Sequence, residues 1–281
     1  MTFPHILVFD SGLGGLTVLE AICATLPEGQ YTYVADNAAF PYGALSEETL
    51  TERIIRVCDH FLSRVTPDIL VIACSTASTL VLPFLRSRFS IPVVGVVPGI
   101  KPAASLSKTK LITLLATPAT VDRPDTQALI HTYAQDCIVS RVGSPMLATY
   151  SEAEFSDHPA TDAQLLDAII PCFIHNDRGK TDVIVLGCTH YPLVLHRLEA
   201  LAPWPVTWVN PAPAIAQRVL SLLPEHERTK TIDIHSMPWG SSVRGKKSAL
   251  FTATPSSLLH NPTFLSRFRF SAITTEAIPF C

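Results

Sequence analysis

The sequence carries little charge of either sign and has no basic excess. Only 16% of its 281 residues are Asp, Glu, Lys or Arg, and the formal net charge is -3 at pH 7. This balance offers no positive field to a phosphate backbone, so we expect no nucleic-acid partner. Hydrophobic residues make up 47% of the chain, which is enough apolar material for one large or two modest globular domains.

No uninterrupted apolar run is long enough to cross a membrane. The most apolar stretch, Ile69–Leu85, is broken by four hydroxyl residues and Pro83, which predicts a buried strand followed by a helix. Near the N-terminus, Asp10 cuts short the apolar segment Ile6–Phe9, and no basic region precedes it. We therefore expect a cytoplasmic protein that does not contact a membrane.

Motifs that hold metals, haem or nucleotides are missing as well. The seven cysteines are an odd number without C-x-x-C spacing, which argues against a disulfide framework and a zinc ribbon. The histidines do not form H-E-x-x-H, and the loop Asp10–Gly15 lacks the G-x-G-x-x-G spacing of dinucleotide sites. We expect no metal and no cofactor, so the chemistry would depend on side chains alone.

What the chain does contain is an alternation of short apolar runs and helical patterns. The runs are nearly continuous, which is typical of parallel strands that helices cover on both faces, and they predict an α/β fold. The expected strands are Ile6–Phe9, Tyr31–Ala35, Ile69–Ala73, Val93–Val96, Leu111–Leu115, Ile138–Val142, Val183–Leu186 and Val206–Val209.

Capping residues predict where two of the helices begin. Ser46 is expected to cap a helix whose first turn holds Glu47 and Glu48. Thr161 and Gln164 form a capping box for another helix. The inner face of the first helix would be Leu50, Ile54, Val57, Phe61, Leu62 and Val65, and that of the second Leu165, Leu166, Ile169, Ile170 and Phe173.

An internal repeat predicts the domain organisation. Val71–Thr76 and Val185–His190 are both apolar strands that end on a cysteine followed by hydroxyl residues, and Cys74 and Cys188 lie 114 residues apart. The loop after the first strand has a counterpart at residues 116–120. We expect two similar α/β domains, residues 1–97 with 210–281 and residues 98–209, related by a pseudo-twofold axis around a central cleft.

The matched cysteines are the strongest candidates for chemistry. Ligands of parallel sheets collect at the carboxyl ends of the strands, where Cys74, Cys188, Asp10 and Thr117 are expected. A thiol has a pKa of about 8.5, so a reactive cysteine needs a helix N-terminus or a proton acceptor nearby. Both cysteines are expected to precede a helix, and Cys188 also has His190 close in sequence. Asp10 could assist a thiol or merely cap its own turn.

Several long motifs, in order, resemble those of the glutamate racemases, which are cofactor-independent enzymes. The resemblance covers most of the chain. The segments that carry it are Phe9–Val18, Asp36–Gly43, Ala73–Ser78, Gly95–Ala103, Leu115–Val121 and Leu186–Leu193.

The resemblance implies a two-base racemase of L- and D-glutamate that supplies D-glutamate for peptidoglycan. Cys74 and Cys188 would exchange protons with Cα, Asp10 would assist Cys74, and Glu152 with His190 would assist Cys188. It also implies a monomer or homodimer and, for the subgroup it resembles most, activation by UDP-MurNAc-L-alanine. The residues implied to line the substrate site are Ser11, Asp36, Tyr42, Gly43, Ser75, Thr76, Thr117, Thr120 and Thr189.

Some positions depart from the family pattern and leave alternatives open. Ser75 stands where the family normally has asparagine, Asn210-Pro211 where it usually has aspartate and serine, and the tail from about His226 matches weakly. A racemase of aspartate or hydantoin, or a decarboxylase of the same superfamily, would keep the fold and change the chemistry. A binding or redox-sensing module that uses its thiols without turnover is the alternative that is not an enzyme.

Overall fold

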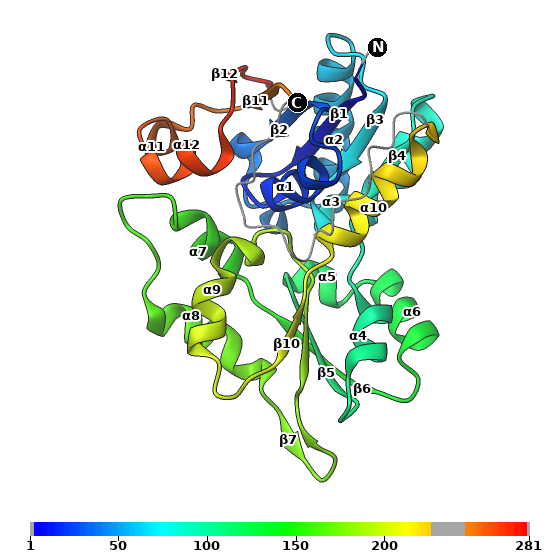
Figure 1. The fold of residues 1–281 in the computed structure, drawn as a ribbon, viewed down its shortest axis with the longest axis vertical. Helices are drawn as coiled ribbons and strands as arrows, with labels where there is room; N and C mark the ends of the chain where they lie inside the picture. Colours follow the sequence, from blue (N-terminus) through cyan, green and yellow to red (C-terminus); the bar gives the residue numbers. More distant parts are fainter. Residues whose placement is uncertain (1–2, 226–244, 280–281) are drawn as a thin grey trace. The chain divides into compact units, whose positions relative to one another are not determined.

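The computed structural model describes residues 3–225 and 245–279. The chain divides into two compact units, Met1–Val96 with Ala212–Cys281 and Val97–Pro211, drawn in Figure 1. These boundaries differ by one or two residues from those expected from the sequence. His226, where the weakly matching tail begins, lies outside the described residues.

The first unit is built on a parallel six-stranded sheet in the order β12-β11-β2-β1-β3-β4. Its two central strands continue directly into the loops that carry candidate site residues, and Phe9 of β1 lies opposite Ile72 of β3. The strands are β1 His5–Asp10, β2 Gln30–Ala35, β3 Ile69–Ile72, β4 Val93–Gly95, β11 Lys247–Phe251 and β12 Ala272–Thr275.

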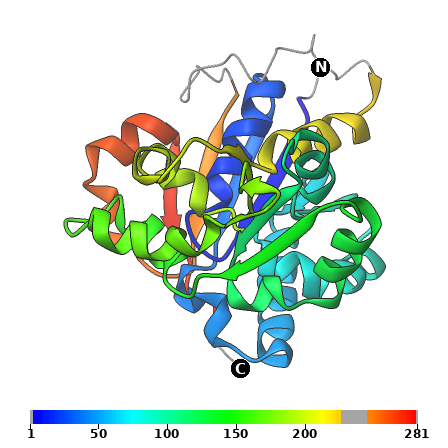
Figure 2. The ribbon, with the colours of Figure 1, turned by 90° about the horizontal axis from the view of Figure 1, so that it is seen from below.

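Helices cover both faces of this sheet, as expected for parallel strands joined by right-handed crossovers. One face is covered by α1 (Gly15–Thr25) with α10 (Ala212–Leu222), and the other by α2 (Glu47–Leu62) with α3 (Ser75–Arg88), as Figure 1 and Figure 2 show. The remaining helical elements of this unit are η1 Asn37–Ala39, η2 Tyr42–Ala44, α11 Ser256–Leu259 and α12 Pro262–Phe268.

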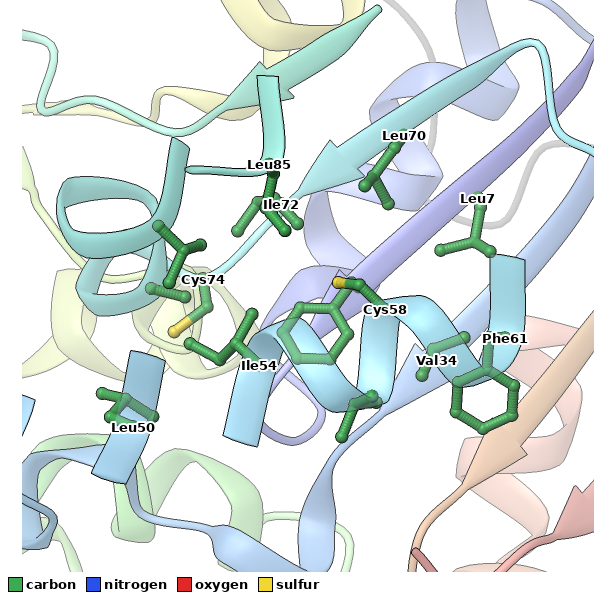
Figure 3. Close-up of a cluster of buried hydrophobic side chains, with 14 of the residues drawn as sticks. Leu7, Val34, Leu50, Ile54, Cys58, Phe61, Leu70, Ile72, Cys74 and Leu85 are labelled. Carbon is green, nitrogen blue, oxygen red and sulfur yellow. The ribbon is translucent and has the colours of Figure 1, made fainter. Parts of the chain in front are cut away.

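Helix α2 begins where its capping residue predicts. The Ser46 hydroxyl accepts a hydrogen bond from the Thr49 amide at 3.3 Å, and Glu47 and Glu48 occupy the first turn. The expected inner face is buried as far as Phe61, whereas Leu62 is half-buried and Val65 lies beyond the helix. Figure 3 shows Leu50, Ile54 and Phe61 in one apolar cluster with side chains of the strands and Cys74.

The second unit repeats the scheme on a parallel four-stranded sheet in the order β10-β9-β5-β6. Helices α4 and α6 pack together, as do α8 and α9, and a short antiparallel hairpin, β7 with β8, precedes β9. The elements are α4 Ile100–Leu106, β5 Leu111–Ala116, α5 Pro118–Val121, α6 Pro124–Tyr133, β6 Ile138–Gly143, α7 Leu147–Ala153, α8 Asp162–Ile169, η3 Ile170–Cys172, β7 His175–Asn176, β8 Gly179–Lys180, β9 Val183–Leu186, η4 Tyr191–Val194, α9 Leu195–Leu201 and β10 Thr207–Val209.

Equivalent backbone hydrogen bonds confirm that the two units are similar. In the first unit the Ala73 amide donates to the Phe9 carbonyl at 2.7 Å, and in the second the Gly187 amide donates to the Leu115 carbonyl at 2.7 Å. Ala73 and Gly187 each directly precede a candidate cysteine. The internal repeat read from the sequence is therefore a repeat of backbone structure, and the predicted α/β class is confirmed.

Some local expectations are wrong. The Thr161–Gln164 capping box is present, but α8 ends at Ile169, and Ile170 is 45% exposed in the following 3₁₀ turn rather than packed inward. The strands β11 and β12 were not predicted, nor was the β7–β8 hairpin. Among the residues described, no helix combines the length and the apolar character needed to span a membrane.

Candidate active site

Cys74 lies at the carboxyl edge of the first sheet, between β3 and α3. It is the N-cap residue of α3, with φ -92° and ψ 122°, and it is 6% exposed. The first turn of a helix presents unpaired amide groups and the positive end of the helix dipole, which stabilise a thiolate. This confirms the expected place of Cys74 at a helix N-terminus.

Asp10, at the end of β1, is connected to Cys74 through a hydroxyl group. Its carboxylate Oδ1 accepts hydrogen bonds from Ser11 Oγ at 3.1 Å and from the Gly12 amide at 3.0 Å. Ser11 Oγ in turn lies 3.8 Å from Cys74 Sγ. Asp10 therefore caps its own turn and lies in the polar surroundings of the thiol, and its role in assisting Cys74 stays a prediction.

Gly15, the first residue of α1, allows this helix to approach Asp10 closely. A Cβ atom at this position would lie 2.7 Å from Asp10 Cβ and 3.0 Å from Ala73 Cβ. Such distances are too short for real carbon contacts, so a larger residue would push the helix away from the carboxylate. The glycine-rich loop thus serves close packing around Asp10.

The Tyr42 side chain is buried, and its hydroxyl group contacts Asp36. It donates a hydrogen bond to Asp36 Oδ2 at 2.8 Å. Burial raises the pKa of Tyr42, and the negative charges of Asp36, Cys74 and Asp10 raise it further. The neighbouring Gly43 is exposed, and a Cβ atom there would meet no other atom within 4 Å.

Ser75 and Thr76 are both buried in the first turn of α3. Within the described chain, Ser75 Oγ is a buried polar atom that has no hydrogen-bond partner. Buried hydroxyl groups normally have a partner, so this group is available to a ligand.

Cys188 has different surroundings, made by a histidine and a carboxylate. Its Sγ lies 3.7 Å from His190 Nδ1, and His190 Nε2 lies 2.8 Å from Glu152 Oε1 on α7. The Glu152 carboxylate can hold the imidazole in one orientation and stabilise its protonated form, which in turn favours a thiolate. Glu152, the least secure assignment from sequence, therefore lies in contact with His190.

The expectation that Cys188 precedes a helix N-terminus is wrong. The chain after Cys188 forms a turn and then the four-residue 3₁₀ element η4, and α9 begins only at Leu195. Pro192 does sit in the first turn of a helical element, but that element is 3₁₀. The polar group next to the Cys188 thiol is the His190 side chain, whereas for Cys74 it is the N-terminus of α3.

Three threonines of the second unit were also expected to line a substrate site. Thr117 Oγ1 and Thr120 Oγ1 lie 2.9 Å apart across the first turn of α5. Thr117 follows β5 as Ser11 follows β1, so the equivalent loops both present a hydroxyl. Thr189, between Cys188 and His190, is buried.

The other described cysteines lack the surroundings of a reactive thiol. Burial raises the pKa values of Cys23 and Cys172 to about 12, and burial raises that of Cys58 as well. These three confirm the expected role of apolar filler. Cys137 is only partly buried, and Cys281 lies outside the described residues. Across residues 3–225 and 245–279, no cluster of His, Cys, Asp and Glu side chains could hold a metal ion.

Sequence reasoning missed two groups that surround Asp36. Arg53 of α2 and Thr252, which follows β11, both bind its carboxylate. Arg53 had a recognisable signal, because it lies three residues after Leu50 and four before Val57 on the inner face of an amphipathic helix. Thr252 had none, since it is 216 residues away from Asp36 in a strand region that was not predicted.

Comparisons with known proteins agree on one family. A family model described as Asp/Glu/Hydantoin racemase matches residues 11–219. A protein named glutamate racemase from Brucella canis is 48% identical over 232 residues, which cover 82% of this chain and 83% of that protein.

Solved structures give the same result. The Escherichia coli glutamate racemase in complex with L-glutamate and the activator UDP-MurNAc-Ala is 35% identical, covers 99% of both chains and gives a TM-score of 0.85. The glutamate racemase isoform RacE1 from Bacillus anthracis is 28% identical, with a TM-score of 0.78.

Proposed function

Because the chain belongs to the Asp/Glu/hydantoin racemase family, we propose that it interconverts L- and D-glutamate by a cofactor-independent, two-base mechanism. The observation that carries the proposal is a matched pair of thiols on equivalent backbone positions. Each thiol has its own polar partners, Ser11 and Asp10 for Cys74 and His190 with Glu152 for Cys188.

In the proposed reaction, one cysteine thiolate removes the proton from Cα of glutamate. The electron pair of the broken C–H bond stays on Cα and is delocalised into the adjacent carboxylate. The other cysteine, in its thiol form, then donates its proton to the opposite face of Cα. After one turnover the two sulfur atoms have exchanged protonation states, and Asp10 and the His190–Glu152 pair would let protons return to their starting places.

Glutamate is the proposed substrate because a relative that is 48% identical is named glutamate racemase, and the Escherichia coli neighbour is described in complex with L-glutamate. We propose that hydroxyl and amide groups hold the two carboxylates and the ammonium group of glutamate. The proposed contacts are Ser11, Tyr42, Gly43, Ser75, Thr76, Thr117, Thr120 and Thr189.

The test is racemisation in deuterated water. L-Glutamate should become D-glutamate that carries deuterium at Cα, because the incoming proton comes from a thiol that has exchanged with solvent. Cys74→Ala and Cys188→Ala should each abolish turnover, while Cys137→Ala serves as the matched control and should retain it. Full activity in both single variants would refute the two-base mechanism.

The same preparation separates the alternatives. Turnover of aspartate or hydantoins in preference to glutamate would support a different racemase of this family. A disulfide between Cys74 and Cys188 found by mass spectrometry, in protein without racemase activity, would support a redox module.

We further propose that UDP-MurNAc-L-alanine activates the enzyme, since the Escherichia coli neighbour is described with that activator. Rates that do not change when the nucleotide is added would refute this.

The product would serve peptidoglycan synthesis. A cytoplasmic location follows from the mechanism, because both thiols have to stay reduced.

A further inference from the structure

Arg53 and Asp36 form a buried ion pair in the first unit. Arg53 Nε and Nη2 donate to Asp36 Oδ2 and Oδ1 at 3.0 and 2.6 Å, and the two side chains are 2% and 0% exposed. A buried bidentate pair of this kind fixes the orientation of the guanidinium and carboxylate planes, and it tolerates little displacement of either side chain. It lies next to the Cys74 site but includes none of the proposed proton-transfer groups.

Asp36 has no capacity left for a substrate ammonium group. Besides the two bonds from Arg53, it accepts hydrogen bonds from Tyr42 Oη at 2.8 Å and from Thr252 Oγ1 at 2.8 Å. A carboxylate offers about four acceptor positions, and four donors occupy them. Asp36 was expected to line the substrate site, but this saturation indicates that it acts on the site through Tyr42.

Arg53 also holds the end of the described chain. Its Nη1 donates to the carbonyl groups of Ile278 and Pro279 at 2.6 and 3.0 Å. Residues 276–279, which we name the C-terminal strap, are attached to α2 at a second place, where Glu276 accepts from His60 at 2.8 Å and pairs with Arg64. Ile278 is buried in the apolar cluster that contains Tyr42 and Cys74.

We propose that Arg53 is a positioning residue for the Cys74 half of the reaction, and that the C-terminal strap is required for this role. The inference rests on the proposed racemase function. Arg53 orients Asp36, Asp36 orients the Tyr42 hydroxyl, and Tyr42 belongs to the same buried cluster as Cys74. The strap carbonyl groups that accept from Nη1 hold the other side of the guanidinium in place.

The first variant is chosen to weaken this series of contacts without removing a charge. Arg53→Lys keeps the positive charge but cannot make the bidentate contact and reach the strap together. The matched control is Arg88→Lys, because Arg88 makes a bidentate pair with Asp59 that is exposed and apart from the site. A third variant lacks residues 276–281 and tests the strap with Arg53 intact.

The first measurement is kcat/KM with the α-deuterium isotope effect, in both directions. Arg53→Lys should lower kcat/KM by about 10- to 100-fold, because misplacing a site group by about 1 Å has effects of this size. The two directions share the same proton transfers, one at each thiol. If the transfer at Cys74 is slowed, the isotope effect rises in the direction where Cys74 removes the proton and falls in the other.

The second measurement does not need turnover. Iodoacetamide alkylation, followed by peptide mass spectrometry, reports the reactivity of each cysteine in the same sample. In Arg53→Lys and in the strap deletion, Cys74 should be alkylated several-fold faster, because the buried cluster that Cys74 shares with Tyr42 and Ile278 loosens, while the rate at Cys188 stays unchanged. Arg88→Lys should match the wild type in both measurements.

Each result decides the inference. Opposite shifts of the two isotope effects, with faster alkylation at Cys74, support it. A lower rate with both isotope effects unchanged would show a general loss of folded enzyme and overturn it, as would wild-type alkylation in Arg53→Lys. A strap deletion that behaves like the wild type would overturn the role of the strap. If the wild type does not racemise glutamate, the proposed function fails, and alkylation alone still decides the role of Arg53.

Discussion

Replacing Glu152 with glutamine tests how the Cys188 site works. The change keeps the shape of the side chain and an oxygen that can accept from His190 Nε2, now 2.8 Å from the carboxylate, but it removes the negative charge. His190 is buried, whereas the Glu152 side chain is 21% exposed. The imidazole would then have to accept a proton from Cys188 without a counter-charge behind it.

The expected loss follows from the strength of a charged hydrogen bond. Such bonds contribute about 1.5 to 3 kcal/mol, more than neutral ones. Since about 1.4 kcal/mol corresponds to a factor of ten in rate, Glu152→Gln should lower kcat by about 10- to 150-fold. Stability should change by less than about 1 kcal/mol, because the ion pair is partly open to solvent.

The assay compares kcat for both enantiomers and the alkylation rate of Cys188. Glu154→Gln is the matched control, since Glu154 lies two residues further along and pairs with Arg197 instead. Glu152→Gln should slow alkylation of Cys188 and leave Cys74 unchanged. Rates within twofold of the wild type for both cysteines and both enantiomers would refute the proposed part played by Glu152.

Two further predictions concern stability. Ser75→Ala should leave the free energy of unfolding in urea unchanged but raise KM, because Ser75 Oγ is unpartnered in the described structure. Ser78→Ala should lower the free energy of unfolding by about 1 to 3 kcal/mol, since Ser78 Oγ donates to the Ile72 carbonyl and accepts from the Val96 amide. Equal effects of the two changes would contradict this. Burial acts to raise the pKa of Asp182, but hydrogen bonds from Ser107 and the amides of residues 108 and 109 outweigh it and hold the pKa below its usual value. A lowered carboxyl pKa stabilises the fold above the unfolded value of about 3.9 and loses this effect as pH falls, so Asp182→Asn should flatten the acid limb of the unfolding curve.

The sequence was sufficient for features that depend on local pattern. Continuous apolar runs predicted the central strands, and the repeated sequence motif around Cys74 and Cys188 predicted two similar units. Capping side chains predicted the starts of α2 and α8, because an N-cap bond spans only three residues. The end of α8 was missed, since Ile170 continues the apolar pattern although the helix has already ended.

Contacts between distant parts of the chain could not be predicted in the same way. Strand β12 is at the edge of the sheet and β11 lies next to it. Both are short and partly exposed, so their sequences lack the apolar run that marks a central strand. They nevertheless bring Thr252 and the C-terminal strap to Asp36 and Arg53. The saturation of Asp36 became visible only with these partners in place.

The two cysteines share a backbone scheme but not their chemical surroundings, and this difference bears on how a symmetrical reaction can proceed. Cys74 lies at a helix N-terminus, with a carboxylate reached through a hydroxyl group, whereas Cys188 has an imidazole backed by a carboxylate. Each thiol in the proposed mechanism acts as base in one direction and as acid in the other. A racemase therefore needs two thiols of comparable proton affinity, which a repeated backbone with unlike partners can provide. Removing either set of partners should slow both directions together, because the two enantiomers have equal free energy.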